Sequence, residues 1–273
     1  RQAGIKTPMN IIACENAIRA SSQLKEAVYG VLSAEGKAFA DEYIGFPDCA
    51  VDRIVPPVKS ENFIDVVVES YFEWDVERAG FKGEIPSIPG MSLVDNLMAY
   101  IERKLFTLNT AHCITAYLGK LHGLPTIDKA IADPDIYATV FAAMQESGAG
   151  LIQKHGFDAG KHAAYIEKII GRFKNPYLQD DVTRVGREPL RKLSPTDRLV
   201  KPLSTAAGYG LPVDHLITGI GAALRYDNPE DKQSAELQEK ISEKGVRDAA
   251  AEITGLHDNH LLDTVVMAYN KLG

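Results

Sequence analysis

The feature that most constrains the fold is an uninterrupted run from Ser92 to His122, which contains no proline and a single glycine near its end. Gly123 and Pro125 follow the run, and both residue types commonly end helices. At its start, Ser92 with Asp95 three residues later resembles a capping box, with Asp in place of the usual Glu or Gln. We therefore predict one helix of about 30 residues, roughly 45 Å long at about 1.5 Å per residue.

The sequence before this helix has a different pattern of residue types. A short apolar run, NIIAC (residues 10–14), predicts a buried strand, and a helix is expected from Glu15 to about Ser33. Segments 50–58 and 64–76 are rich in β-branched and aromatic residues, which predicts two antiparallel strands. Further helices are expected at 133–155, 159–173, 213–225, 231–253 and 258–271. The chain should therefore divide into a β-containing segment, residues 1–90, and a mainly helical domain, residues 91–273.

Composition narrows the class of protein. With 273 residues, 45% of them hydrophobic, the chain can bury a substantial hydrophobic core without covalent cross-links. A net charge of -7 argues against nucleic acid or an anionic membrane as the main partner. The three cysteines (Cys14, Cys49 and Cys113) form no disulfide framework, so we expect a cytoplasmic protein. Adjacent His112 and Cys113 make a poor chelate on a helix, and no metal is predicted. Oligomeric state is not indicated.

Three polar residues in the long helix carry the spacing K-x4-N-x2-H: Lys104, Asn109 and His112. In a regular α-helix, Asn109 would lie about 140° around the axis from Lys104, and His112 about 80°. One broad arc would then hold an amine, an amide and an imidazole. Lysine is usually a solvated surface residue, however, and Asn and His often bind neighbouring backbone groups. The spacing alone therefore does not decide between catalysis and structure.

A second region is unusually basic for an acidic protein. Between residues 184 and 201 only Glu188 and Asp197 oppose six basic side chains: Arg184, Arg187, Arg191, Lys192, Arg198 and Lys201. The guanidinium group donates two parallel hydrogen bonds, which suits phosphate. This pattern predicts an anion site, and the candidate ligands are Arg187, Arg191, Lys192 and Arg184. A solvated or salt-bridged loop is the alternative for each residue.

The K-x4-N-x2-H motif resembles the active-site motif of the polyol-specific long-chain dehydrogenases. Other segments are similar to the mannitol-1-phosphate 5-dehydrogenase branch of that family, among them NIIACENAIRASSQLK, GFPDCAVDRIVPP, GRFKNPYLQDDVTRVGREPLRKLSPTDRL and YGLPVDHLI. The resemblance covers nearly the whole chain. It implies a mainly α catalytic domain of the 6-phosphogluconate-dehydrogenase C-terminal type, with a remnant α/β Rossmann segment and a small antiparallel β element on the N-terminal side.

The resemblance also implies a reaction and the residues that perform it. The expected activity is NAD-linked interconversion of D-mannitol 1-phosphate and D-fructose 6-phosphate in mannitol metabolism, without a metal. Lys104 would be the general base, which requires a lowered pKa. Asn109 and Asn16 would donate hydrogen bonds to the developing alkoxide. His112 would orient the substrate hydroxyls or Lys104, and a purely structural histidine is the alternative.

The sequence departs from this family in one respect. No G-x-G-x-x-G follows a strand, so the residues that bind the cofactor are unknown. The resemblance implies that roughly the first hundred residues of the family pattern are absent from these 273. We expect these 273 residues alone to bind NAD poorly and to turn over little. Two alternatives remain: a related dehydrogenase of the mannitol 2-dehydrogenase or fructuronate reductase type, acting on an unphosphorylated polyol or a sugar acid, or a non-catalytic helical interaction module.

Overall fold

The computed structural model describes residues 4–273, apart from residues 5, 16, 56–60 and 63. Its residues form two compact units, which we describe separately. The first unit extends to Glu102, and the second begins at Arg103 and extends to Gly273. The predicted architecture is confirmed: small α/β and β elements lie on the N-terminal side, and the remainder is mainly helical.

The first unit opens with a parallel pair of short strands. β1 (Met9–Asn10) pairs with β2 (Ile44–Gly45), and two helices, α1 (Ala20–Val31) and α2 (Ala34–Tyr43), connect them. Parallel strands need such a crossover connection, and this arrangement is the α/β element that the sequence predicts. The predicted bounds of both elements were wrong, because only the first residue of NIIAC lies in a strand and the helix starts at Ala20 rather than residue 15.

A second sheet follows in the same unit. β3 (Cys49–Asp52) and β4 (Glu73–Glu77) pair in antiparallel fashion, with Cys49 opposite Val76. The predicted pairing is therefore confirmed, but the second strand is much shorter than residues 64–76. The apolar side chains from Ile64 to Val68 are exposed, so the segment does not bury its β-branched residues as a strand. A short 3-10 turn, η1 (Arg78–Gly80), comes after β4.

The predicted capping box at Ser92 is wrong. Ser92 lies in a third strand, β5 (Met91–Val94), which runs parallel to β4 and places Ser92 opposite Asp75. The residues that were predicted to begin the helix therefore pair with the backbone of β4 instead. Helical structure starts later, at α3 (Leu97–Arg103), where the Asn96 side chain accepts a hydrogen bond from the backbone N–H of Ala99 at 3.3 Å.

The predicted long helix exists between Leu97 and Leu121, but it is not uniform. After α3 comes a π-helical segment, η2 (Lys104–Asn109), and then α4 (Thr110–Leu121). The remaining helices of the second unit are α5 (Ile127–Ala132), α6 (Pro134–His155), α7 (Ala159–Phe173), η3 (Pro176–Leu178), α8 (Val182–Gly186), α9 (Pro189–Lys192), α10 (Val200–Gly208), α11 (Asp214–Leu224), α12 (Lys232–Lys244), α13 (Val246–Thr254) and α14 (Asn259–Lys271).

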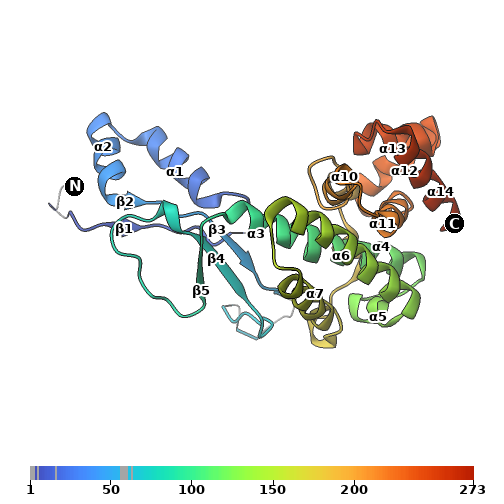
Figure 1. Cartoon of the computed structure of the whole chain (residues 1–273), viewed down its shortest axis with the longest axis horizontal. Coiled ribbons are helices and arrows are strands. Elements are labelled where there is room, and N and C mark those ends of the chain that lie inside the picture. Colours follow the sequence, from blue (N-terminus) through green and yellow to red (C-terminus); the bar gives the residue numbers. More distant parts are fainter. Residues whose placement is uncertain (1–3, 5, 16, 56–60, 63) are drawn as a thin grey trace. The chain divides into compact units, whose positions relative to one another are not determined.

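Helix α4 is the centre of the second unit. Residues 113–119 are all buried, so the helix is covered on every side. It packs against α5, α6, α8 and α11, and of these α5, α6 and α11 are labelled in Figure 1. The packing against α11 is close at Gly219, where a Cβ atom would lie 2.6 Å from the Ile114 side chain. A larger residue at position 219 would push these two helices apart.

Helix α6 shows how local residues set helix boundaries in this unit. The side chain of Asp133 accepts hydrogen bonds from the first turn of α6, Pro134 is the first helical residue, and Gly156 ends the helix at a φ of 70°. One prediction was wrong: residues 231–253 are two helices rather than one. Gly245 divides them at a φ of 79°, a left-handed value that interrupts a helix. No helix among the described residues is long and apolar enough to cross a bilayer.

Candidate active site

The predicted catalytic lysine and asparagine lie at the two ends of the π-helical segment. Lys104 is its first residue and Asn109 its last. The backbone N–H of Thr110 donates to the carbonyls of Leu105 and Thr107, and not to that of Phe106, which a regular α-helix would use. A turn that closes over five residues brings Lys104 and Asn109 nearer to one face than the angle of about 140° expected in an α-helix.

The two ends of this segment are more accessible than its middle. Phe106, Thr107 and Leu108 are buried, whereas Lys104 and Asn109 are half-buried. Within the described part of the chain, the carboxamide of Asn109 makes no side-chain hydrogen bond. Its N–H donors are therefore available to a ligand. The segment therefore holds the Lys104 amine and the Asn109 amide at its two half-buried ends, while its buried middle anchors it in the core.

His112, one turn further along, is tied to a residue that the sequence did not single out. Its Nε2 atom lies 2.8 Å from Oδ2 of Asp180, with angles too poor for a well-aligned hydrogen bond. The imidazole also stacks on Phe173, with ring centroids 5.0 Å apart and an interplanar angle of 18°. Its side chain is only 16% exposed. The ring is thus fixed in position, which fits either an orienting role or the structural alternative.

Asp180 is held by charge on both sides. Its other oxygen, Oδ1, accepts from Arg184, whose Nε lies 2.9 Å away and whose terminal nitrogen also contacts it. Burial raises the pKa of Asp180, but the contact with the His112 imidazole and the positive charge of Arg184 lower it more, so the pKa falls below its ordinary value. Asp180 therefore stays ionised. Arg184, a predicted phosphate ligand, already has an anionic partner here.

The sequence does carry a signal for Asp180, in its spacing from Arg184. Asp180 and Arg184 are four residues apart, a spacing that pairs opposite charges along a helix. The loop that holds Asp180 is also anchored to the segment after α4: the N–H of Ile127 donates to the Asp180 carbonyl at 2.9 Å, and the N–H of Val182 donates to that of Pro125 at 3.0 Å. Only the folded chain shows that this loop reaches His112.

Two of the six basic side chains in residues 184–201, the basic segment, are paired with carboxylates of the same segment. Arg191 contacts Glu188 at 2.9 Å and Asp197 at 3.1 Å, and Arg198 contacts Asp197 at 2.8 Å. Burial raises the pKa of Asp197, but Arg198 and Arg191 lower it below its ordinary value. Arg191 therefore fits the salt-bridged alternative as well as the anion-site hypothesis. The predicted excess of positive charge is partly neutralised where it stands.

Lys192 is buried rather than presented to solvent. Its ammonium donates to the carbonyl of Val185 at 2.6 Å and also to that of Arg187. Burial lowers its pKa to about 8. These bonds tie the turn between α8 and α9 and leave one of the three ammonium hydrogens for another acceptor.

Arg187 differs from its basic neighbours. It is exposed, and within the described residues its guanidinium makes no hydrogen bond or ion pair. Of the four predicted phosphate ligands, Arg187 is therefore the one whose guanidinium group has all its N–H donors available to bind a ligand.

The remaining predicted site residue, Asn16, lies outside the described residues. Its role as a second donor to the alkoxide stays a prediction. No group of three or more His, Cys, Asp or Glu side chains in the described part of the chain is arranged to hold a metal ion.

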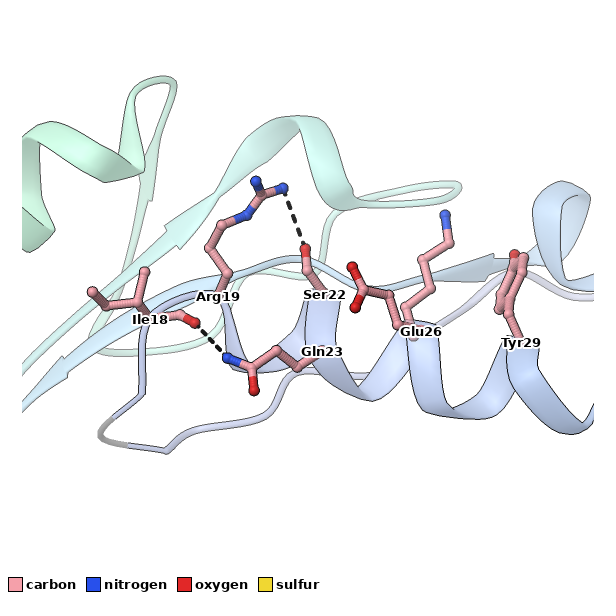
Figure 2. Close-up of a pocket in the computed structure, with 7 residues that line it drawn as sticks. Ile18, Arg19, Ser22, Gln23, Glu26 and Tyr29 are labelled. Carbon is pink, nitrogen blue, oxygen red and sulfur yellow. Dashed lines mark hydrogen bonds between the residues drawn. The ribbon is translucent and has the colours of Figure 1, made fainter.

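The first unit contains an open pocket of about 580 Å³ along α1 (Figure 2). Arg19 and Ser22 line it, and both bind the carboxylate of Asp48, with the Ser22 hydroxyl donating at 2.6 Å. Gln23 donates to the carbonyl of Ile18 at 2.8 Å. Several polar groups of this pocket are thus used in holding the start of α1, and Lys104, Asn109 and His112 do not line it.

Fold and site together define a two-part chain with an α/β segment followed by a helical domain carrying Lys104, Asn109 and His112. The model of the mannitol dehydrogenase Rossmann domain matches residues 1–90, and that of the mannitol dehydrogenase C-terminal domain matches residues 96–272. The chain belongs to the mannitol dehydrogenase family.

Two solved structures share its fold. A D-sorbitol dehydrogenase in substrate-free form matches 98% of this chain with a TM-score of 0.82 and 18% sequence identity. A Pseudomonas fluorescens mannitol 2-dehydrogenase in ternary complex with NAD and D-mannitol matches 99% of it with a TM-score of 0.73 and 19% identity. This chain spans 61% of the length of each.

Proposed function

We propose that the protein containing this chain is an NAD-dependent polyol dehydrogenase in which Lys104 exchanges the proton of the reacting hydroxyl. The observation that carries the proposal is the π-helical segment, which holds an amine and an unbonded carboxamide at its two half-buried ends. Family membership supports it, as does the NAD bound to a structure of the same fold.

These residues account for the proton half of an alcohol oxidation. The Lys104 amine accepts the hydroxyl proton, while an N–H of Asn109 stabilises the negative charge that develops on the oxygen. In the reverse direction the Lys104 ammonium returns the proton. The His112 ring is held in place by Asp180 and Phe173. We therefore assign it a role in orienting the substrate and not in carrying a proton. NAD, when bound, supplies the acceptor for the hydride that leaves the carbinol carbon.

The cofactor's phosphates are not bound by a glycine-rich turn of this sequence. The connection from β1 to α1 contains no glycine, whereas the turn that holds a pyrophosphate needs several for close backbone approach. We therefore assign no pyrophosphate ligand to these residues.

For the substrate we propose D-mannitol 1-phosphate, oxidised to D-fructose 6-phosphate. The available guanidinium of Arg187 and the surrounding basic segment support a phosphorylated substrate. The test compares kcat/KM of the full-length enzyme for mannitol 1-phosphate and mannitol. We expect at least about a 100-fold preference for the phosphorylated polyol, since charge-assisted bonds to phosphate contribute roughly 1.5–3 kcal/mol each. Equal values would refute the substrate assignment and leave the reaction class intact.

A second candidate is a dehydrogenase of an unphosphorylated polyol or a sugar acid. The paired state of Arg184 and Arg191 favours it, because these side chains already bind carboxylates of the chain itself. It predicts turnover of mannitol or fructuronate at rates that a terminal phosphate does not improve.

A further inference from the structure

The carbonyl of Phe106 is the backbone group that the π-helical segment displaces. In an α-helix it would accept from the N–H of Thr110, four residues on. Here that N–H donates to Leu105 and Thr107 instead. Phe106 is fully buried, so water cannot take the place of the lost donor. A buried carbonyl that has lost its α-helical donor is stabilised when another group donates to it.

Ser147 of α6 supplies that donor. Its hydroxyl lies 2.9 Å from the Phe106 carbonyl, and both residues are fully buried. The hydroxyl has one hydrogen, and its alternative acceptor is the Met144 carbonyl in its own helix, at 3.1 Å. Nothing in the local sequence of the π-helical segment provides this bond, since Ser147 is 41 residues away.

Thr110 holds the other side of the same segment. Its hydroxyl lies 2.9 Å from the carbonyl of Leu105 and 2.6 Å from that of Arg198. The hydroxyl has one hydrogen, so these two carbonyls are alternative acceptors: the bond to Leu105 reinforces the wide turn, and the bond to Arg198 joins the turn to the basic segment. Two buried hydroxyls from different elements therefore converge on consecutive carbonyls of the segment that carries Lys104 and Asn109.

We propose that Ser147 and Thr110 are positioning residues, which hold the wide turn between Lys104 and Asn109 so that amine and amide meet the same substrate oxygen. This inference rests on the proposed function and goes beyond it. Without Ser147, the Phe106 carbonyl loses a buried donor, which favours a return of the segment to α-helical bonding with the Thr110 N–H. That change rotates Asn109 away from Lys104, and misplacement of about 1 Å can cost a rate factor of about 100.

The first test is Ser147→Ala in the full-length enzyme. We expect kcat to fall about 10- to 100-fold with little change in KM, and the primary deuterium isotope effect on kcat to rise as chemistry becomes rate-limiting. The matched control is Thr115→Val, which removes a buried hydroxyl that donates to the Ala111 carbonyl at 2.8 Å within α4. The control should keep its kcat and isotope effect.

Thr110 provides an independent arm if Ser147→Ala folds poorly. Thr110→Ser keeps the hydroxyl and should keep most of kcat, whereas Thr110→Val removes it and should lower kcat. Equal kcat values for these two folded variants would overturn the proposal for Thr110.

A crystal structure of the Ser147→Ala enzyme separates this inference from the assigned activity. The proposal requires the Thr110 N–H to donate to the Phe106 carbonyl in that variant. A persisting wide turn, or a lost turn with wild-type kcat, would each overturn it. Failure of the proposed function appears elsewhere, as a Lys104→Ala enzyme of unaltered rate.

Discussion

The π-helical segment and the basic segment of the second unit differ in how far their polar side chains are already bonded within the protein. The sequence indicates a site in each of them. In the former, the unusual backbone places Lys104 and Asn109 at half-buried positions with the Asn109 amide unbonded. In the latter, Arg184, Arg191 and Arg198 are bonded to carboxylates of the same unit. A concentration of charge is thus a weaker indicator of a binding site than a polar group that the fold leaves available.

The same comparison distinguishes residues of one type. Arg187 and Arg191 are four positions apart and both exposed, yet only Arg191 has ion-pair partners. Asn109 and Asn175 are both half-buried, yet Asn175 accepts from the N–H of Tyr177 at 3.1 Å. These pairs allow the site hypothesis to be tested with controls drawn from the chain itself.

The largest effect in this comparison is expected for Asn109→Ala in the full-length enzyme. Loss of a donor to the developing alkoxide should lower kcat about 100- to 1000-fold. Steady-state kinetics with mannitol 1-phosphate measures it. Asn175→Ala is the control: it removes a cap at η3 and should cost about 1 kcal/mol of stability without lowering kcat. If both variants lose kcat equally, Asn109 has no special role.

Asp180→Asn should have the next largest effect. The variant loses the negative charge that Arg184 and His112 share, which we expect to cost about 2 kcal/mol in the free energy of unfolding at pH 7. The pKa of Asp180 is lowered in the folded chain, so its contribution is present above the ordinary value of about 4 and disappears as pH falls through the folded value.

Urea unfolding of both proteins at several pH values checks this prediction. The difference between wild type and Asp180→Asn should be greatest near neutral pH and shrink below about pH 4. A difference that grew on acidification would show that the carboxylate does not stabilise the fold in its ionised form.

A smaller effect is expected for the arginine pair. Arg187→Ala should raise KM for the phosphorylated substrate about 10-fold or more, because its guanidinium can bind phosphate directly. Arg191→Ala breaks exposed ion pairs and should change stability by less than about 1 kcal/mol, with little effect on KM. Titration of each variant with fructose 6-phosphate decides the matter, and equal KM values would assign the phosphate elsewhere.

Much of the helical architecture was predictable from local sequence signals at the ends of the helices. The helices at 134–155, 159–173 and 259–271 begin at aspartate caps, and the first of them ends at Gly156, signals that act within a few positions. The failures come from distant partners. Ser92 joins a strand because β4 lies beside it, and no local pattern around Ser92 reports that pairing.

The features of the site also divide into those that the local sequence predicts and those that depend on distant residues. The spacing of Lys104, Asn109 and His112 is visible in the sequence, and so is the charge of the basic segment. The wide turn is not, because it depends on Ser147 in another helix. Nor is the pairing of His112 with Asp180, which requires the loop before α8 to fold back on α4.

The central claim is that the Lys104 amine exchanges the proton of the substrate hydroxyl, and the pH dependence of fructose 6-phosphate reduction by Lys104→Ala tests it most directly. Removing a general acid–base group should lower kcat about 100- to 10 000-fold and abolish the limb of the pH profile that belongs to Lys104. A variant that retained both the wild-type rate and the wild-type profile would contradict the account.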